Sequence, residues 1–391
     1  MQRLSEMGPL TGFKVIEFSG IGPGPFAGMM LADMGAEVIC ISRPDDKSET
    51  KFQVSERGKK SIILDLKSAV GIKASKALIA DADALIEGFR PGVMERLGLG
   101  PEPCLALNPR LVYGRMTGWG QHGPLSTRAG HDINYLALSG ALHGIGRRGN
   151  KPVLPVNYLG DFGGGAMYLA FGITCALLEA TRSGKGQVVD AAIVDGAASL
   201  TACTYGLHAE GVWRDERGNN FLDGAAHFYD VYETADHQFI TIGALEPKFY
   251  KELMVLMGLD ADEIASFHCR YFEGGVEDRD TWPQLKATLE SAFKTKTRDE
   301  WCRLLEGTDV CFAPVLSMRE ASSHPHNKAR KNFVEIDNVK QPAPAPRFSR
   351  TGCDLPGAPQ PRGAQTTTVL SELALTEREI HSLLKTANIE S

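Results

Sequence analysis

The chain lacks the cysteine spacing that builds metal or dithiol sites. It contains eight cysteines, and none of them forms a Cys-x-x-Cys pair. Because such pairs are typical of zinc and redox sites, we expect no metal site and a reducing compartment. Cys40 and Cys175 lie in apolar runs, so we expect both to be small buried side chains.

Positive charge and long apolar runs are also scarce. The chain has 42 Lys and Arg against 48 Asp and Glu, a net charge of -6, whereas nucleic-acid-binding domains are typically basic. No stretch reaches about eighteen apolar residues, the N-terminus has no apolar signal core, and the C-terminus is not of the Ser-Lys-Leu type. We therefore expect no nucleic-acid partner, no membrane partner and a cytoplasmic location, in a bacterium or a eukaryote.

What the chain has in its first half is a regular alternation of short apolar runs with amphipathic stretches. Strands that alternate with helices predict an α/β fold, with a mostly parallel sheet covered on both faces. The length of 391 residues favours two domains. The predicted strands are 14–18, 37–41, 61–64, 84–87, 111–113 and 187–192, and the predicted helices are 26–34, 70–80, 168–182 and one with Pro91 at its first position.

The second half of the chain is predicted to form a smaller domain. Residues 214–224 are polar and rich in Gly and Asn, which indicates a linker, and the strands 229–233 and 239–242 form a predicted β-hairpin. Six prolines between Pro342 and Pro361 indicate an extended connection, and Thr376-x-x-Glu379 is a capping box that begins a last helix. Helices around 249–257 and 301–305 are expected to pack on the hairpin.

The loop after the first strand, residues 20–27, lies where a doubly wound fold binds its ligand. Gly22-x-Gly24-x-x-Ala27 matches the dinucleotide fingerprint, but Pro23 and Pro25 each remove an N–H that a pyrophosphate would use. The second strand leads to Arg43 instead of the acidic residue that NAD requires. A phosphorylated ligand bound by local Arg and Lys side chains is one interpretation. A turn of purely geometric role beside a solvated basic face is the other.

Two titratable groups stand beside glycines. His131 follows Gly130, and Asp161 lies between Gly160 and the run Phe162-Gly163-Gly164-Gly165. Moving a proton from one face of a carbon to the other requires such a pair of acid and base. The structural alternatives are a histidine that only packs and an aspartate that caps a helix, and Asp132 is expected to cap the helix 133–138.

Several separated motifs together resemble the family III coenzyme A transferase superfamily, and within it the racemases that act on α-methylacyl-CoA thioesters. The N-terminal motifs are Ser19-Gly20-x-x-Pro23-Gly24-Pro25-Phe26, Leu31-Ala32-Asp33-x-Gly35-Ala36, Arg57-Gly58-Lys59-Lys60-Ser61 and Leu64-Asp65-Leu66-Lys67. The later ones are Gly130-His131-Asp132-Ile133-Asn134-Tyr135, Asp161-Phe162-Gly163-Gly164-Gly165, Gly184-Lys185-Gly186-Gln187 and Gly243-Ala244-Leu245-Glu246-Pro247.

The resemblance implies a Rossmann-like large domain, a smaller α+β domain and an interlocked homodimer. In this layout residues 1–213 form the N-terminal part of the large, CoA-binding domain, 214–224 a linker, 225–318 the small domain, and 319–391 a segment that returns to the large domain. No separate cofactor is implied, since coenzyme A is part of the acyl-CoA substrate of fatty-acid or lipid metabolism. The implied catalytic residues are His131, Asp161 and Glu246, the last orienting His131. The implied ligand contacts are Arg43, Leu64, Asp65, Leu66, Lys67, Gly88, Phe89, Arg90, Arg96, Gly130, Asp132, Ile133, Asn134 and Tyr135.

The implied reaction, interconversion of (2R)- and (2S)-2-methylacyl-CoA through an enolate, fits these residue types. A histidine titrates near neutrality and so suits both proton removal and return. For Asp161, burial would raise the pKa and a glycine-rich helix start would lower it, and the sequence leaves the balance open. Open N–H groups at that helix start are expected to stabilise the enolate oxygen.

Two other functions fit the resemblance. A family III CoA-transferase would use Asp161 as a nucleophile and need no histidine, and a silent CoA-binding scaffold would lack the acid/base pair. The presence of His131 and the single glycine in Gly243-Ala244-Leu245-Glu246 favour the racemase. The acyl chain is not specified, because fatty, sterol-derived and other branched groups all fit the sequence.

Overall fold

The computed structural model describes residues 8–46, 48–259, 279–352, 354–387 and 389. The chain folds into two compact units. The first combines Met1–Ser139, Val156–Leu200 and His326–Ser391, and the second combines Gly140–Pro155 and Thr201–Pro325. The predicted division differs from this at three places, because 140–155, 201–224 (which includes the expected linker) and 319–325 belong to the second unit.

Residues 214–224 form a hydrogen-bonded turn and not a loose linker. The Asn220 side chain donates to the carbonyl oxygens of Arg214 and Glu216, and the Asp223 carboxylate accepts the N–H groups of Asn219 and Asn220. Gly and Asn are as common in such turns as in linkers, which is why composition alone did not separate the two.

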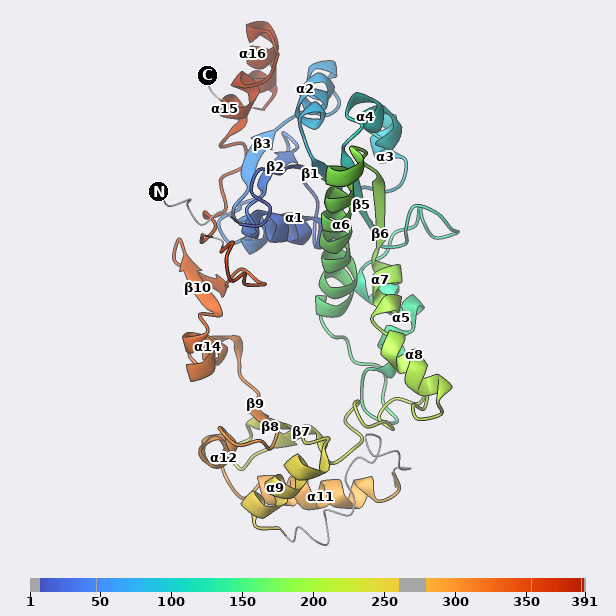
Figure 1. Ribbon diagram of the computed structural model, residues 1–391, viewed down its shortest axis with the longest axis vertical. Helices are drawn as coiled ribbons and strands as arrows, with labels where there is room; N and C mark the ends of the chain where they lie inside the picture. Colours follow the sequence, from blue (N-terminus) through green and yellow to red (C-terminus); the bar gives the residue numbers. More distant parts are fainter. Residues whose placement is uncertain (1–7, 47, 260–278, 353, 388, 390–391) are drawn as a thin grey trace. The chain divides into compact units, whose positions relative to one another are not determined.

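The first unit is built on a parallel sheet of six strands in the order β3-β2-β1-β4-β5-β6, which confirms the α/β prediction. Figure 1 shows α1 and α6 on one face of this sheet and α2, α3 and α4 on the other. The strands are β1 (Lys14–Phe18), β2 (Glu37–Ser42), β3 (Lys60–Ile63), β4 (Ala84–Glu87), β5 (Val112–Thr117) and β6 (Val188–Ala192). The helices are α1 (Pro23–Asp33), η1 (Val54–Glu56), α2 (Ala69–Ala80), α3 (Val93–Arg96), α4 (Pro101–Leu107), α5 (Asp132–Ser139), η3 (Tyr158–Ala166), α6 (Met167–Ser183) and α7 (Ile193–Ser199).

Alternate residues of the strands supply two separate cores. Val15 packs with Ala27 and Leu31 of α1 on one face, while Ile16 packs with Leu78 of α2 on the other. Because successive strand side chains point to opposite faces, strands covered on both sides read as nearly continuous apolar runs. This is why the strand predictions succeeded here.

The C-terminal segment returns to the first unit and covers the outer edge of β3. Gly363 and Gln365 bond to Ser61, and the N–H of Ile63 donates to the Thr366 hydroxyl at 3.0 Å. These bonds occupy backbone groups that an edge strand would otherwise expose. The predicted capping box of Thr376 and Glu379 is present. The segment contains α14 (Pro325–Ala329), β10 (Phe333–Ile336), β11 (Val339–Pro342), α15 (Thr366–Ser371) and α16 (Glu377–Thr386).

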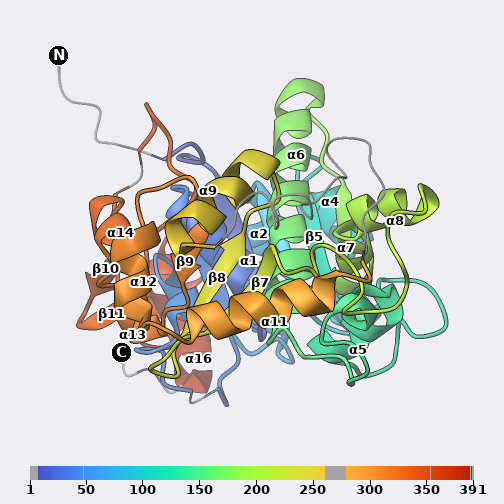
Figure 2. The ribbon, with the colours of Figure 1, turned by 90° about the horizontal axis from the view of Figure 1, so that it is seen from below.

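The second unit contains an antiparallel sheet in the order β7-β8-β9, and the predicted hairpin is its first pair. Tyr232 and Ile240 face helices that bring Leu253, Phe293 and Trp301 into one core. Figure 2 shows α9 and α11 lying across these strands. The elements are η2 (Ala141–Gly144), α8 (Ala202–Ala209), β7 (Tyr229–Glu233), β8 (Phe239–Gly243), α9 (Pro247–Met257), α11 (Trp282–Phe293), α12 (Arg298–Leu305), β9 (Phe312–Pro314) and α13 (Met318–Ala321).

Three local predictions need correction. Helix α1 begins at Pro23 and not at Phe26, and the helix near Pro91 is the short α3, whose N-cap is Gly92. Cys40 is buried as expected, but Cys175 is exposed. Helix α6 packs on the sheet through Leu169, Ile173 and Leu177, and Cys175 does not lie on that face of the helix.

One helical stretch of the described residues, Tyr158–Ser183, is long and apolar enough to cross a membrane by length and composition. Of the residues tested, 44% are buried in the structure. Core helices meet the same criterion, and Ile173 and Leu177 of this stretch pack against the sheet. The expected lack of a membrane partner stays a prediction.

Candidate active site

A cavity of about 530 Å³ opens beyond the carboxyl ends of β1, β4 and β5. The chain runs from β1 through β2 to β3 on one side of the sheet and then through β4 to β6 on the other, so the strand order reverses between β1 and β4. Open parallel sheets bind ligands at such a point. The cavity is lined by residues 18, 20–25, 88–91, 116–119, 126, 128–131, 135, 157, 161 and 193.

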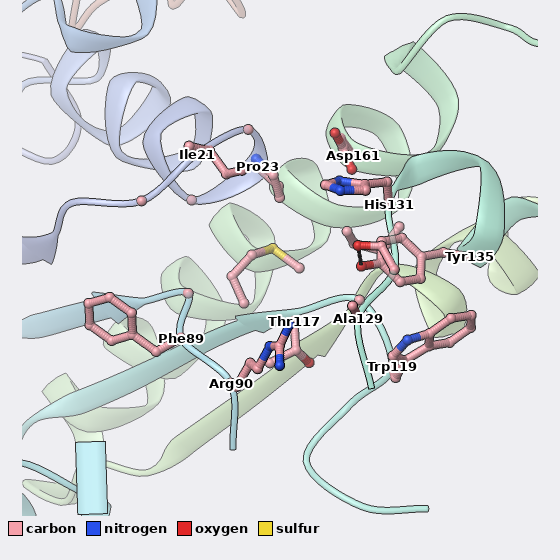
Figure 3. Close-up of a pocket in the computed structure, with 18 of the residues that line it drawn as sticks. Ile21, Pro23, Phe89, Arg90, Thr117, Trp119, Ala129, His131, Tyr135 and Asp161 are labelled. Carbon is pink, nitrogen blue, oxygen red and sulfur yellow. Dashed lines mark hydrogen bonds between the residues drawn. The ribbon is translucent and has the colours of Figure 1, made fainter. Parts of the chain in front are cut away.

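Asp161 lies in η3, a π-helix of nine residues directly before α6. The glycines of η3 allow close packing, since a Cβ on Gly164 would lie 2.7 Å from the backbone nitrogen of Ala197 in α7. Phe162 stacks on Phe26 of α1 with ring centroids 4.6 Å apart. Single π-helical turns occur frequently at functional sites. Here the turn is held between α1 and α7, and Figure 3 shows the Asp161 carboxylate at the rim of the cavity next to His131.

The turn before α1 covers that carboxylate. Gly22 has a φ of 68°, a conformation that glycine adopts without strain, and a Cβ there would lie 3.4 Å from Asp161 Oδ2. The Gly22-x-Gly24 pattern, which resembled a dinucleotide fingerprint, thus brings the backbone close to a carboxylate.

His131 enters the cavity from the loop before α5 and is exposed. Its backbone N–H donates to Asn134 Oδ1 at 3.0 Å, and its backbone carbonyl accepts the backbone N–H groups of Asn134 and Tyr135. Asn134, predicted as a ligand contact, therefore fixes the turn that presents the imidazole.

Asp132 does not occupy the position predicted for it. It is the first residue of α5 and not its cap, and its carboxylate is buried against η3, where Oδ1 accepts the N–H of Asp161 at 2.7 Å. The N–H of Phe162 is also engaged, by the carbonyl of Asn157. The expectation that these N–H groups are open for an enolate oxygen is therefore wrong.

The structure answers the open question about Asp161. Burial raises the pKa of its carboxyl group, and the neighbouring Asp132 carboxylate raises it further. The hydrogen bond with Asn157 and the charge of His131 lower it, and the net direction is upward. Burial therefore outweighs the hydrogen bond with Asn157 and the charge of His131.

Glu246 lies in the second unit, at the N-cap position of α9. Its side chain makes no capping hydrogen bond, so the structural alternative of a cap is not realised. Its predicted role as the partner of His131 stays a prediction.

Only part of the predicted ligand set lines the cavity. Gly88, Phe89, Arg90, Gly130 and Tyr135 do so. Leu64 is 1% exposed and lies in the core of the first unit. The residues outside the cavity lining, whose contacts with a ligand stay predictions, are Arg43, Leu64, Asp65, Leu66, Lys67, Arg96, Asp132, Ile133 and Asn134.

Trp119 and Arg128 line the cavity without having been predicted. Trp119 packs edge-on against Tyr135, with ring centroids 4.7 Å apart. The signal was a Gly-Trp-Gly sequence at a strand end, but it was missed because the predicted strand stopped at Tyr113. The strand continues through Arg115, whose buried guanidinium pairs with Glu87 at 2.8 Å.

One group of possible metal ligands occurs among the described residues, formed by Glu17, Cys40 and Glu56. The Lys59 ammonium lies 2.8 Å from Glu17 Oε2 and 3.7 Å from Glu56 Oε2. It supplies positive charge at the place where a cation would bind, so these residues do not fit a metal site.

Known proteins are similar to this chain over nearly its whole length. Alpha-methylacyl-CoA racemase of Mus musculus is 44% identical over 388 residues, which cover 98% of each chain, and the Homo sapiens protein of that name is 42% identical over 98% of each. The crystal structure of a CAIB/BAIF family protein from Brucella suis has a TM-score of 0.79 at 26% identity and covers 94% of this chain and 99% of its own. The profile of CoA-transferase family III matches residues 10–366. Together with the parallel sheet and the cavity at its switch point, this match shows that the chain belongs to CoA-transferase family III.

Proposed function

We propose that this protein is an α-methylacyl-CoA racemase that interconverts (2R)- and (2S)-2-methylacyl-CoA thioesters. The observation that carries the proposal is the placement of His131 and Asp161 on two different elements around one cavity. The racemases of Mus musculus and Homo sapiens, similar over nearly the whole chain, support the same activity.

The proposed reaction is a 1,1-proton transfer. For one enantiomer, neutral His131 takes the α-proton, the electron pair of the C–H bond moves into the thioester to form an enolate, and protonated Asp161 returns a proton to the other face of the carbon. For the other enantiomer, the Asp161 carboxylate is the base and the imidazolium is the acid. The raised pKa of Asp161 supports this, since an acid that titrates closer to neutrality can serve in both directions.

The substrate would enter with its thioester between these two groups. Gly88, Phe89 and Arg90 line the cavity and are proposed to contact coenzyme A. The proposed reaction needs no separate cofactor, because coenzyme A is part of the substrate. The interlocked homodimer and the role of Glu246 are proposals that rest on the family resemblance, and the cytoplasmic location stays a prediction from the sequence.

The second candidate is CoA transfer to a free acid, with Asp161 as nucleophile. It is kept because the family includes such enzymes and Asp161 is open to the cavity. In that reaction the carboxylate attacks the thioester carbonyl and the CoA thiolate leaves. His131 has no role in those steps, so its position beside Asp161 favours the racemase.

Deuterium uptake tests the proposal. The purified protein, incubated with (2R)- or (2S)-2-methylacyl-CoA in D₂O, is expected to label the α-carbon and to produce both enantiomers. His131→Ala and Asp161→Ala should each slow labelling by roughly 100- to 10,000-fold, unequally for the two enantiomers. Transfer of CoA to a free acid without α-labelling would refute racemisation, and wild-type rates in both variants would refute the assigned roles.

A further inference from the structure

Asp132 is buried at a point where both of its neighbours are exposed. The residue is 7% exposed, whereas His131 and Ile133 are open to solvent. It lies in the first turn of α5, on the side that faces η3, and it is not among the residues that line the cavity. A ligand contact therefore does not account for its carboxylate.

The carboxylate fits into the first turn of η3. Asp132 Oδ1 accepts the N–H of Asp161 at 2.7 Å, and the N–H of Gly160 also bonds to this carboxylate. A Cβ on residue 160 would lie 2.2 Å from Oδ1, so the contact requires glycine at this position. Oδ2 is buried and has no hydrogen-bond partner among the described residues.

This contact links the two groups of the proposed proton transfer by a short path. His131 is joined to Asp132 by a peptide bond, and the Asp132 side chain is hydrogen-bonded to the backbone of Asp161. Since α5 and η3 are separate in the sequence, their spacing depends on side-chain contacts of this kind.

We propose that Asp132 is a positioning residue, whose carboxylate, by accepting the N–H of Asp161, fixes the separation of His131 and Asp161 around the substrate carbon. The proposal rests on the proposed racemase function for its catalytic meaning, but the contact can be tested without turnover. A misplacement of about 1 Å at a reacting group can cost roughly 100-fold in rate.

The charge of Asp132 adds a second effect. The titratable groups that interact with it are Asp161 on η3 and Tyr135 on its own helix. His131 interacts with Asp161, and Arg90 after β4 interacts with Tyr135. Its carboxylate raises the pKa of Asp161. Burial raises the pKa of Asp132 itself, opposed by the hydrogen bonds from Asp161 and Gly160.

Two substitutions separate these effects. Asp132→Asn keeps an acceptor oxygen for the Asp161 N–H and removes the charge, whereas Asp132→Ala removes both. Asp83→Asn is the matched control, because Asp83 accepts the N–H of Lys14 at 2.8 Å in the same unit but lies outside the lining of the cavity.

The first measurement does not depend on activity. Amide hydrogen exchange of peptides covering η3 should be faster in Asp132→Ala than in the wild type and the control. The pKa of Asp161, followed by NMR of ¹³C-labelled aspartate, should be lower in Asp132→Asn. Unchanged η3 exchange in Asp132→Ala would overturn the proposal even if the wild type is an active racemase. An unchanged pKa of Asp161 in Asp132→Asn would refute the second effect, that of the charge.

The second measurement uses α-deuterium exchange. Asp132→Ala is expected to lower kcat by roughly 10- to 100-fold with little change in KM. Asp132→Asn should retain more activity and shift the acid limb of its pH profile to lower pH. A kcat equal to that of the wild type in Asp132→Ala would overturn the proposal. A pH profile in Asp132→Asn that coincides with the wild type would refute the effect of the charge. A wild type without any exchange would refute the proposed function and leave the first measurement as the test of the contact.

Discussion

Replacement of Lys59 by methionine should destabilise the first unit strongly and with a defined pH dependence. The Lys59 side chain is 2% exposed and that of Glu17 is 0% exposed. Lys59 Nζ lies 2.8 Å from Glu17 Oε2 and donates to the Pro25 carbonyl at 2.9 Å. A Cβ on Gly28 would lie 1.9 Å from Glu17 Oε2, so α1 leaves the carboxylate no room to move away. Methionine fills a similar volume but leaves this carboxylate buried without its cation.

The loss of stability in Lys59→Met follows from the buried charge of Glu17. Removing one partner of a buried ion pair typically costs about 3–5 kcal/mol. Burial raises the pKa of Glu17 to about 7, although the charge of Lys59 lowers it. Because the folded pKa lies above the ordinary value of 4.5, the stability that this group contributes is present below pH 4.5 and is lost as the pH rises through 7.

In the wild type this loss ends above about pH 7, where Glu17 is ionised in both states. In Lys59→Met the pKa of Glu17 rises further, because the cation that lowered it is gone. The free energy of unfolding of the variant should then keep falling above pH 7, by at most about 1.4 kcal/mol per pH unit relative to the wild type.

Urea unfolding followed by circular dichroism at pH 6, 7, 8 and 9 measures this difference. Lys59→Met/Glu17→Gln should recover most of the stability, since replacing both partners removes the unpaired charge. Lys73→Met is the surface control, because its ion pair with Glu379 lies at the solvent-accessible surface and should contribute little to the free energy of unfolding. A loss in Lys59→Met that is the same at pH 6 and pH 9, or that the double variant does not relieve, would refute the reasoning.

Three further predictions concern other sites. Burial, together with the charge of Lys286, lowers the pKa of His227 to about 3, so below about pH 6.5 the unfolded chain binds a proton that the folded chain does not bind. This difference should lower the free energy of unfolding by about 2 kcal/mol between pH 6.5 and pH 4.5, and urea unfolding should show a smaller loss of stability in acid in His227→Phe. Arg90→Met should raise KM for the acyl-CoA by roughly tenfold while kcat changes little, which initial rates at low and high salt would check. Gly160→Ala should reduce α-deuterium exchange as strongly as Asp132→Ala, because its Cβ would displace Asp132 Oδ1; a variant as active as the wild type would contradict the contact.

Most strands of the first unit could be predicted because they carry buried apolar residues on both faces. β1, β2 and β4 lie within one residue of their predicted ends. β5 was cut short, since Gly114 and Arg115 interrupt its apolar pattern. Arg115 is buried through its ion pairs with Glu87 and Glu95, two residues that are distant in the sequence. The local sequence pattern cannot show such a partner. Because the predicted strand stopped at Tyr113, the Gly-Trp-Gly sequence that follows the true strand end was also missed.

The site residues also divide into those that the local sequence pattern predicts and those that depend on a distant partner. His131 and Asp161 line the cavity as expected, because glycine-flanked titratable residues at element ends tend to reach the ligand edge of a parallel sheet. Asp132 could not be placed, because helix-capping rules consider only its own helix, whereas its partner is the N–H of Asp161. Arg43 and Lys67 follow β2 and β3, which lie farther from the point where the strand order reverses.

The electrostatics of the site favour proton transfer in both directions. Efficient turnover in both directions is favoured when two protonation states of the pair are close in free energy: neutral histidine with protonated aspartic acid, and imidazolium with carboxylate. An ordinary aspartic acid is too strong an acid for this, because its pKa lies below that of imidazole by more than about two units. Burial and the Asp132 carboxylate both raise the pKa of Asp161, and so bring it toward the range in which imidazole titrates. A nucleophilic carboxylate must be ionised to attack, so that reaction does not require a raised pKa. The buried Asp132 therefore fits the exchange of protons better than the transfer of coenzyme A.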